Sequence, residues 1–236
     1  MPHSPPTWLQ HLRGQFIVFD GPDGCGKTTQ LNRFVQFTEM NGLSVCAVRD
    51  PGGTEVGNQI RQLLLTPPHQ EDMDVRCEML LFMASRAQLV TTRIKPALDA
   101  GKVVLADRFV SSTLAYQGAA GGLPQEDILE VSRIAFGNCS PSLFIIFDVD
   151  TDMASARLAA SPKKTIPPLE FDVDGGALCP DRIEAKGSNY QKAVRQGYLN
   201  QAAADPDHYL IINASADADA VFTKLLESLE SKSAMF

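Results

Sequence analysis

Short runs of apolar residues recur along the chain, and nearly every position within each run is apolar. This pattern is typical of strands buried on both faces of a parallel sheet, because a strand with one exposed face alternates apolar and polar residues. The runs that we predict to be strands are residues 16–19, 45–48, 103–106, 143–147 and 209–212.

Helix-like stretches lie between these runs and after the last of them. The predicted helices are residues 28–40, 56–65, 77–98, 126–136, 188–204 and 217–231. Alternating strands and helices with right-handed crossovers build a doubly wound α/β fold. We therefore predict three layers, with a five-stranded parallel sheet flanked by helices, in a single domain over residues 14–236.

Two segments do not fit this pattern. Residues 1–13 contain three prolines and no apolar core of signal-peptide length, so we predict a flexible tail from which Trp8 and Leu9 could dock on the surface. Residues 161–181 contain four prolines and two glycines. A loop of that length inside a compact domain is usually functional or disordered, and we assign it to a lid segment over residues 157–186.

The composition of the chain limits its partners and its compartment. The net charge is −7, whereas a protein that binds nucleic acid or an anionic membrane normally carries a basic face, so we expect neither partner. No apolar run approaches the roughly 20 residues that span a bilayer. The five cysteines have no metal-binding spacing, which favours reduced thiols and a cytoplasmic protein.

The stretch GPDGCGKT at residues 21–28 fits the phosphate-loop pattern G-x-x-x-x-G-K-[ST]. A predicted strand ends just before it and a helix begins at its end, which favours a phosphate loop over a glycine-rich turn with a surface lysine. Backbone amides and the helix N-terminus would hold phosphates, with Lys27 between the β- and γ-phosphates of ATP and Thr28 on Mg²⁺. The residues predicted to bind ATP are Gly21, Pro22, Asp23, Gly24, Cys25, Gly26, Lys27, Thr28 and Thr29.

Five further motifs follow the phosphate loop in the sequence. They are Arg49-Asp50-Pro51-Gly52-Gly53-Thr54, Phe82-Met83-Ala84-Ser85-Arg86, Asp107-Arg108-Phe109, Ser112-Thr113-Leu114-Ala115-Tyr116-Gln117-Gly118 and Asp181-Arg182-Ile183-Glu184. In order and spacing they resemble bacterial thymidylate kinases, which are P-loop nucleoside monophosphate kinases. The resemblance runs from about residue 16 to the C-terminus, apart from the lid segment. It implies transfer of the γ-phosphoryl group of ATP to dTMP, with Mg²⁺, in a homodimer.

Phe82 and Arg86 are four residues apart on a predicted helix and therefore share a face. An aromatic ring and a guanidinium together can stack on a base and donate a hydrogen bond to its carbonyl edge. The resemblance assigns both positions, with Thr113, to the thymine ring. The alternative places Phe82 in the core and Arg86 in an ion pair with Glu78 or Asp74.

Asp107 and Arg108 stand where a strand ends, and ligands of open parallel sheets bind outside the carboxyl ends of strands. We expect Asp107 to hold Mg²⁺ or its waters and Arg108 to bind the acceptor phosphate as a bidentate donor. The alternative is a structural Asp–Arg pair.

By resemblance, Asp23 contacts the sugar 3′-hydroxyl and Tyr116 packs on the deoxyribose. The residues expected to border the acceptor site are Arg49, Asp50 and Gln117.

Thymidylate kinases also need a further cation for the transferring phosphoryl group, and the phosphate loop of this chain carries none besides Lys27. The lid segment must then supply it, although it resembles the family poorly and carries an insertion of about ten residues. Arg182 is the first candidate, because it lies in a matching motif, and Arg157 is the second. Lys163 and Lys164 are further candidates or simply solvated charges.

The predicted reaction needs no general base. The second pKa of a phosphate monoester is about 6, so the attacking oxygen of dTMP is already ionised at neutral pH and catalysis consists of alignment and charge neutralisation. The nearest alternative is a kinase for another pyrimidine monophosphate, such as dUMP, UMP or CMP. A regulatory nucleotide-binding switch and a nucleoside kinase are more distant alternatives.

Overall fold

The computed structural model describes residues 6–65, 72–160 and 187–232 of the 236-residue chain. Its five strands form one parallel sheet in the order β2-β3-β1-β4-β5, which confirms the predicted fold class. The strands are β1 (Phe16–Asp20), β2 (Val45–Arg49), β3 (Val103–Asp107), β4 (Leu143–Asp148) and β5 (Tyr209–Asn213).

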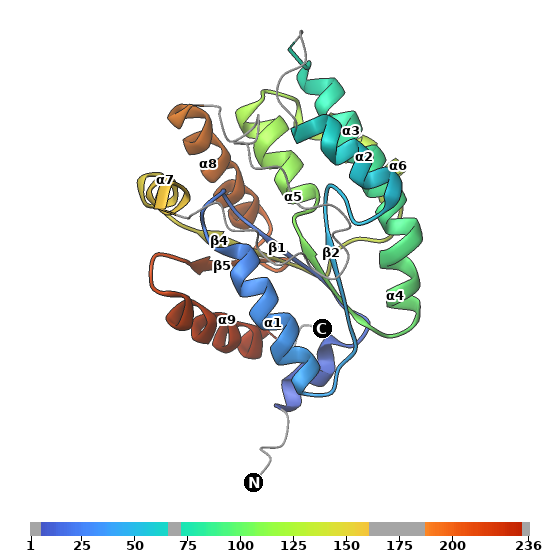
Figure 1. The fold of residues 1–236 in the computed structure, drawn as a ribbon, viewed down its shortest axis with the longest axis vertical. Coiled ribbons are helices and arrows are strands. Elements are labelled where there is room, and N and C mark those ends of the chain that lie inside the picture. Colours follow the sequence, from blue (N-terminus) through green and yellow to red (C-terminus); the bar gives the residue numbers. More distant parts are fainter. Residues whose placement is uncertain (1–5, 66–71, 161–186, 233–236) are drawn as a thin grey trace.

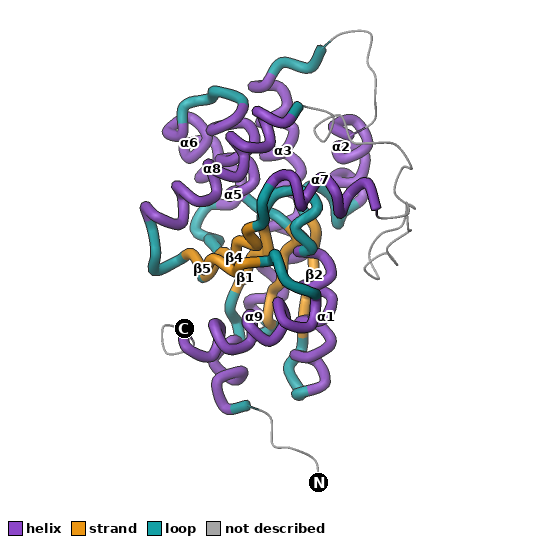
Figure 2. Tube along the Cα trace, turned by 90° about the vertical axis from the view of Figure 1, so that its left-hand side faces the viewer, coloured by secondary structure: helices purple, strands orange, loops and turns teal. Residues whose placement is uncertain are grey.

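Helices cover both faces of this sheet (Figures 1 and 2). The α-helices in the described residues are α1 (Lys27–Met40), α2 (Glu55–Leu65), α3 (Val75–Leu89), α4 (Lys95–Asp99), α5 (Val110–Thr113), α6 (Gln125–Phe136), α7 (Thr151–Ala160), α8 (Ser188–Ala204) and α9 (Ala218–Lys232). A 3₁₀-helix, η1 (Thr7–Leu12), precedes β1, and two π-helical segments are η2 (Val90–Ile94) and η3 (Leu114–Ala120).

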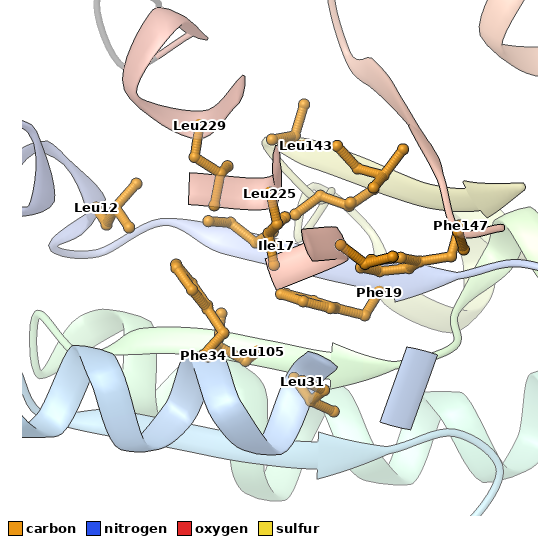
Figure 3. Close-up of a cluster of buried hydrophobic side chains, with 14 of the residues drawn as sticks. Leu12, Ile17, Phe19, Leu31, Phe34, Leu105, Leu143, Phe147, Leu225 and Leu229 are labelled. Atoms are coloured by element: carbon orange, nitrogen blue, oxygen red, sulfur yellow. The ribbon is translucent and has the colours of Figure 1, made fainter. Parts of the chain in front are cut away.

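Successive residues of a strand point to opposite faces of the sheet, so each buried strand supplies two cores. Ile17 and Phe19 pack beneath η1, α1 and α9, as Figure 3 shows for part of this cluster. Phe16 and Val18 face the other way, toward α4, α5, η3 and α8. Burial on both faces explains why the central strands β1, β3 and β4 read as continuous apolar runs. The edge strand β5 is equally apolar in sequence but only partly buried, with Ile211 44% exposed.

Each strand extends one residue beyond its predicted end, and the added residue is polar in every case. These residues are Asp20, Arg49, Asp107, Asp148 and Asn213. Backbone pairing continues through them, so apolarity alone ends the predicted strand too early. They place polar groups along the carboxyl edge of the sheet, where ligands bind in such folds.

Residues Thr7–Leu12 correct the prediction of a flexible tail over residues 1–13. They form η1, in which Trp8, Leu9 and Leu12 are buried in the core beneath the sheet. Burying three large apolar side chains outweighs the entropy lost by ordering one short turn. Only residues 6–13 of the predicted tail are among those described.

The predicted helix over residues 77–98 is divided in the structure. It comprises most of α3, the π-helical η2 and most of α4. The change of helix type comes just before Pro96, which has no N–H to donate and whose ring excludes the carbonyl group four residues earlier. Across the described parts of the chain, no helix is both long and apolar enough to cross a bilayer.

Candidate active site

The predicted phosphate loop connects β1 to α1, which is the strand–loop–helix arrangement that the motif requires. Gly24 adopts φ +81°, and a Cβ atom there would lie 2.4 Å from the carbonyl oxygen of Ala154 on α7. Only glycine permits both this backbone conformation and this close packing. The loop therefore presents its backbone at the N-terminus of α1, where the helix dipole favours an anion.

Thr28 and Asp107 come together at the carboxyl edge of the sheet, although 79 positions separate them in the chain. The Thr28 hydroxyl donates to Asp107 Oδ2 over 2.9 Å. Such oxygen groups suit Mg²⁺, which prefers hard oxygen ligands. The described residues contain no cluster of three His, Cys, Asp or Glu side chains for a metal, so phosphate and water oxygens would complete such a site.

A cavity of about 310 Å³ opens beside the phosphate loop. It brings together every residue predicted to bind the acceptor: Asp23, Arg49, Asp50, Phe82, Arg86, Arg108, Thr113, Tyr116 and Gln117. It also contacts Lys27, Thr28 and Asp107, so the donor and acceptor sides share one space. Four other lining residues were assigned no role from the sequence: Pro51 and Ser112, which lie within the quoted motifs, and Arg61 and Leu65, which lie outside them.

Arg86 is fully buried at one end of this cavity, where its Nη1 donates to Met83 Sδ over 3.1 Å and three further contacts hold it. Its Nε donates to Asp50 Oδ2 over 2.6 Å, and its Nη2 donates to Thr113 Oγ1 over 3.1 Å. Its guanidinium also lies over the Phe109 ring. The ion pair of Arg86 is with Asp50, 36 positions away in the chain, whereas the alternative placed it with Glu78 or Asp74.

Asp50 remains incompletely satisfied in this pair. Its Oδ1 atom is buried and has no hydrogen-bond partner in the described part of the chain. Burial raises the pKa of this carboxyl group even though the charge of Arg86 acts in the opposite direction. A buried oxygen without a partner next to an open cavity can accept a hydrogen bond from a ligand or its water.

Arg108 crosses the cavity at the end nearest the phosphate loop. It adopts φ +69°, an uncommon conformation for a residue other than glycine, directly after β3. Its Nη2 donates to Asp23 and, over 3.3 Å, to the Tyr116 hydroxyl. The Tyr116 hydroxyl in turn donates to Asp23 Oδ2 over 2.9 Å, and Lys27 Nζ lies 3.4 Å from Asp23 Oδ1. An entering phosphate group would therefore compete with Asp23 for Arg108.

Of the cations predicted for the transferring phosphoryl group, only Arg157 is among the described residues, and it does not line this cavity. Arg157 on α7 donates to the carbonyl oxygens of Ala214, Ser215 and Ala216 at 2.7, 3.1 and 3.1 Å, and it is not among the cavity residues. Its catalytic role stays a prediction without support from these contacts. The other candidates, Arg182, Lys163 and Lys164, lie outside the described residues.

A parallel sheet with a phosphate loop after β1, and an adjoining cavity lined by four arginines and two aromatic rings, defines a P-loop nucleotide kinase. The family model described as thymidylate kinase matches residues 19–225. A thymidylate kinase of Geobacillus sp. (strain WCH70) is 37% identical over 92% of this chain and 97% of its own length. One of Pelotomaculum thermopropionicum is 39% identical over 93% of this chain and 94% of its own length.

Solved structures agree with these sequence comparisons. The crystal structure of thymidylate kinase from Ehrlichia chaffeensis has a TM-score of 0.69 to this chain at 27% identity. The match covers 91% of this chain and 98% of that one. The chain belongs to the thymidylate kinase family.

Proposed function

We propose that the protein transfers the γ-phosphoryl group of ATP to dTMP, giving ADP and dTDP, the step that leads to dTTP for DNA synthesis. One observation carries the proposal: a single cavity joins the phosphate-loop residues Lys27 and Thr28 to Arg86, Thr113 and the other acceptor residues. A pocket built for both nucleotides allows direct transfer between them. Membership of the thymidylate kinase family supports the same reaction.

The donor and acceptor sides have separate roles in this proposal. Lys27 and the loop amides hold the phosphates of ATP, while Arg108 holds the phosphate of dTMP. Thr28 and Asp107 would hold Mg²⁺, which neutralises charge on the transferring phosphates when bound. Because the attacking phosphate oxygen is already ionised at neutral pH, these groups have only to align the reactants and neutralise charge.

The base is recognised at the other end of the cavity, and the sugar next to Arg108, which contacts both Asp23 and Tyr116. Phe82 stacks on the thymine ring, and Arg86, held by Asp50 and Thr113, donates to its carbonyl edge. Tyr116 packs on the deoxyribose and Asp23 accepts from its 3′-hydroxyl. Arg49 and Gln117 border the bound nucleotide. Arg182 of the lid segment remains our first choice for the additional cation, ahead of Arg157.

We also propose that the enzyme is a cytoplasmic homodimer. Free thiols at Cys25, Cys46, Cys77 and Cys139 are typical of a reducing compartment. The packed helices α2, α3 and α6 expose several large apolar side chains, as an uncovered subunit interface does. The exposed side chains on these helices are Val56, Leu63, Leu80, Leu129 and Ile134.

An acceptor panel tests the proposed specificity. ADP release is followed with ATP, Mg²⁺ and, in turn, dTMP, dUMP, UMP, CMP, AMP, GMP or thymidine. We expect dTMP to exceed each other acceptor in kcat/KM by about tenfold or more, equivalent to about 1.4 kcal/mol of transition-state discrimination. Lys27→Ala protein, purified identically, shows how much of the signal comes from contaminants. Equal turnover of UMP or CMP would replace the proposal with its pyrimidine alternative.

A further inference from the structure

Asp20 ends β1 in a fully buried position at the edge of the acceptor cavity. Its carboxylate accepts hydrogen bonds from one backbone amide and three hydroxyl groups. The donors are Gly21 N at 2.9 Å, Ser111 Oγ at 2.6 Å, Ser112 Oγ at 2.8 Å and the Tyr198 hydroxyl at 2.7 Å. A buried carboxylate is costly without such partners, so this cluster is a satisfied and therefore well-ordered polar network.

Two of these hydroxyl groups connect Asp20 to Arg108. Arg108 Nη1 donates to Ser112 Oγ over 2.9 Å and to the Tyr198 hydroxyl over 3.1 Å, and it lies 3.2 Å from Asp20 Oδ1. Each hydroxyl gives its hydrogen to Asp20 and keeps its lone pairs for the guanidinium. Burial and the negative charge of Asp20 raise the pKa of Tyr198 well above its ordinary value, so this hydroxyl stays a donor.

The two terminal nitrogens of Arg108 thus have different surroundings. Nη1 is held by the Asp20 cluster, whereas Nη2 contacts Asp23 and Tyr116, which line the cavity. The left-handed backbone at Arg108 is unfavourable for a residue other than glycine and persists only where contacts with its surroundings hold it in place. The Asp20 cluster provides such contacts through Nη1, on the side of the guanidinium that faces away from the ligand.

Tyr198 reaches this cluster from α8, which approaches η3 closely. A Cβ atom at the neighbouring Gly197 would lie 2.7 Å from Ala119 Cβ and 3.1 Å from Ala115 Cα. Because glycine allows this contact, α8 is near enough for the Tyr198 ring to be buried with its hydroxyl on Asp20. The close packing of α8 on η3 therefore fixes the position of the Tyr198 hydroxyl next to Asp20.

We propose that Asp20 and Tyr198 are positioning residues for Arg108: they hold Nη1 in place so that Nη2 meets the acceptor phosphate. The inference rests on the proposed function, because it assumes that Arg108 binds the phosphate of dTMP. Neither residue touches the substrate in this account, and both act through the guanidinium. ATP is held by Lys27 and the loop amides, so its binding does not depend on the cluster.

The variant Tyr198→Phe tests this inference, because it removes the hydroxyl and keeps the buried ring. We expect dTMP binding, measured by calorimetry, to weaken about tenfold, which corresponds to about 1.4 kcal/mol. The KM for dTMP should rise while the KM for ATP stays the same. Tyr209→Phe is the matched control. It removes a tyrosine hydroxyl on β5 that donates to Gln201 of α8, the helix that carries Tyr198, and that does not contact Arg108.

A second measurement separates positioning from a structural effect. In an Arg108→Ala background, Tyr198→Phe should no longer change kcat/KM for dTMP, which is measurable without saturation. Asp20→Asn, which keeps the shape of the side chain and removes its charge, should reproduce the selective loss for dTMP.

Three results would overturn the inference: unchanged dTMP binding in Tyr198→Phe, an equal loss for ATP, or a loss that persists without Arg108. Failure of the proposed function would look different, because the wild-type protein itself would then neither bind nor phosphorylate dTMP.

Discussion

Asp23 lies among cations in a loop that must also hold phosphates. Burial by itself would raise the pKa of this carboxyl group, but the charges of Arg108 and Lys27 and the hydrogen bond from Tyr116 together hold it well below its usual range. The carboxylate is therefore ionised at neutral pH and keeps Arg108 directed at the cavity until a phosphate competes for it.

The lowered pKa of Asp23 predicts how stability depends on pH. An aspartate with a lower pKa in the folded than in the unfolded protein stabilises the fold above its unfolded pKa of about 4. That contribution is lost as the pH falls toward the folded pKa. We expect the free energy of unfolding, from urea titrations between about pH 7 and pH 3, to fall less steeply in Asp23→Asn than in the wild type.

Asp152→Asn serves as the control for this comparison, because Asp152 is exposed on α7. It should show the wild-type dependence on pH. If Asp23→Asn loses as much stability on acidification as the wild type does, Asp23 does not have the environment described.

Single residues also show where prediction from the sequence stops. The phosphate loop is recognisable because its residues are adjacent and their spacing is itself the signal. The partners of Arg86 and Arg108 are not, because Asp50 is 36 positions from Arg86 and Tyr198 is 90 positions from Arg108. Hydrophobic periodicity contains no information about which distant polar groups the fold brings together.

At the scale of elements, the central strands β1, β3 and β4 were predictable because burial on both faces leaves a simple apolar run. Besides η1, two helical segments were not predicted, α7 and the pair α5–η3. The first has a weak amphipathic pattern, with Ala154 as its only buried residue. The second has a π-helical turn, whose spacing differs from that of an α-helix. That segment carries Thr113 and Tyr116, so its residues were identified through their motif.

The helix η1 leads to a prediction about stability without a change in catalysis. Leu9 is fully buried between the sheet, α1 and α9. We expect Leu9→Ala to lower the free energy of unfolding by about 2–5 kcal/mol, because it leaves a cavity in the core. Trp8 is the single tryptophan of the chain and is buried, so its fluorescence reports unfolding directly.

The same variant should leave the KM for dTMP unchanged, since Leu9 is not among the cavity residues. Met40→Ala provides the comparison, because Met40 ends α1 and is 87% exposed. Equal stability of the Leu9→Ala and Met40→Ala proteins would mean that η1 is not part of the core.

At the scale of the whole molecule, the sheet order places β1 and β3 side by side, so the phosphate loop and the Asp107–Arg108 motif meet at one edge. The alternation of strands and helices predicts a doubly wound sheet, and ligand binding at its carboxyl edge follows from that topology. Residues 161–186 of the lid segment lie outside what the structure describes, so the source of the additional cation stays a prediction.

The proposed dimer also belongs to this scale. Leu80 lies on α3 and is 53% exposed, so Leu80→Glu places a charge within the proposed apolar interface. We expect this variant to elute as a monomer, because burying an unpaired charge is costly, while Met40→Glu remains dimeric. Light scattering coupled to size-exclusion chromatography measures both masses. A wild-type protein that is monomeric at every concentration would contradict the proposal.

Direct observation of the product tests the central claim, phosphoryl transfer from ATP to dTMP. Purified protein is incubated with ATP, Mg²⁺ and dTMP, and the phosphorus resonances of the mixture are followed by NMR. The account predicts that dTDP and ADP appear together in equal amounts and that neither forms when dTMP is omitted. ADP accompanied by inorganic phosphate, with no dTDP, would contradict it and indicate a protein that hydrolyses ATP without using dTMP as acceptor.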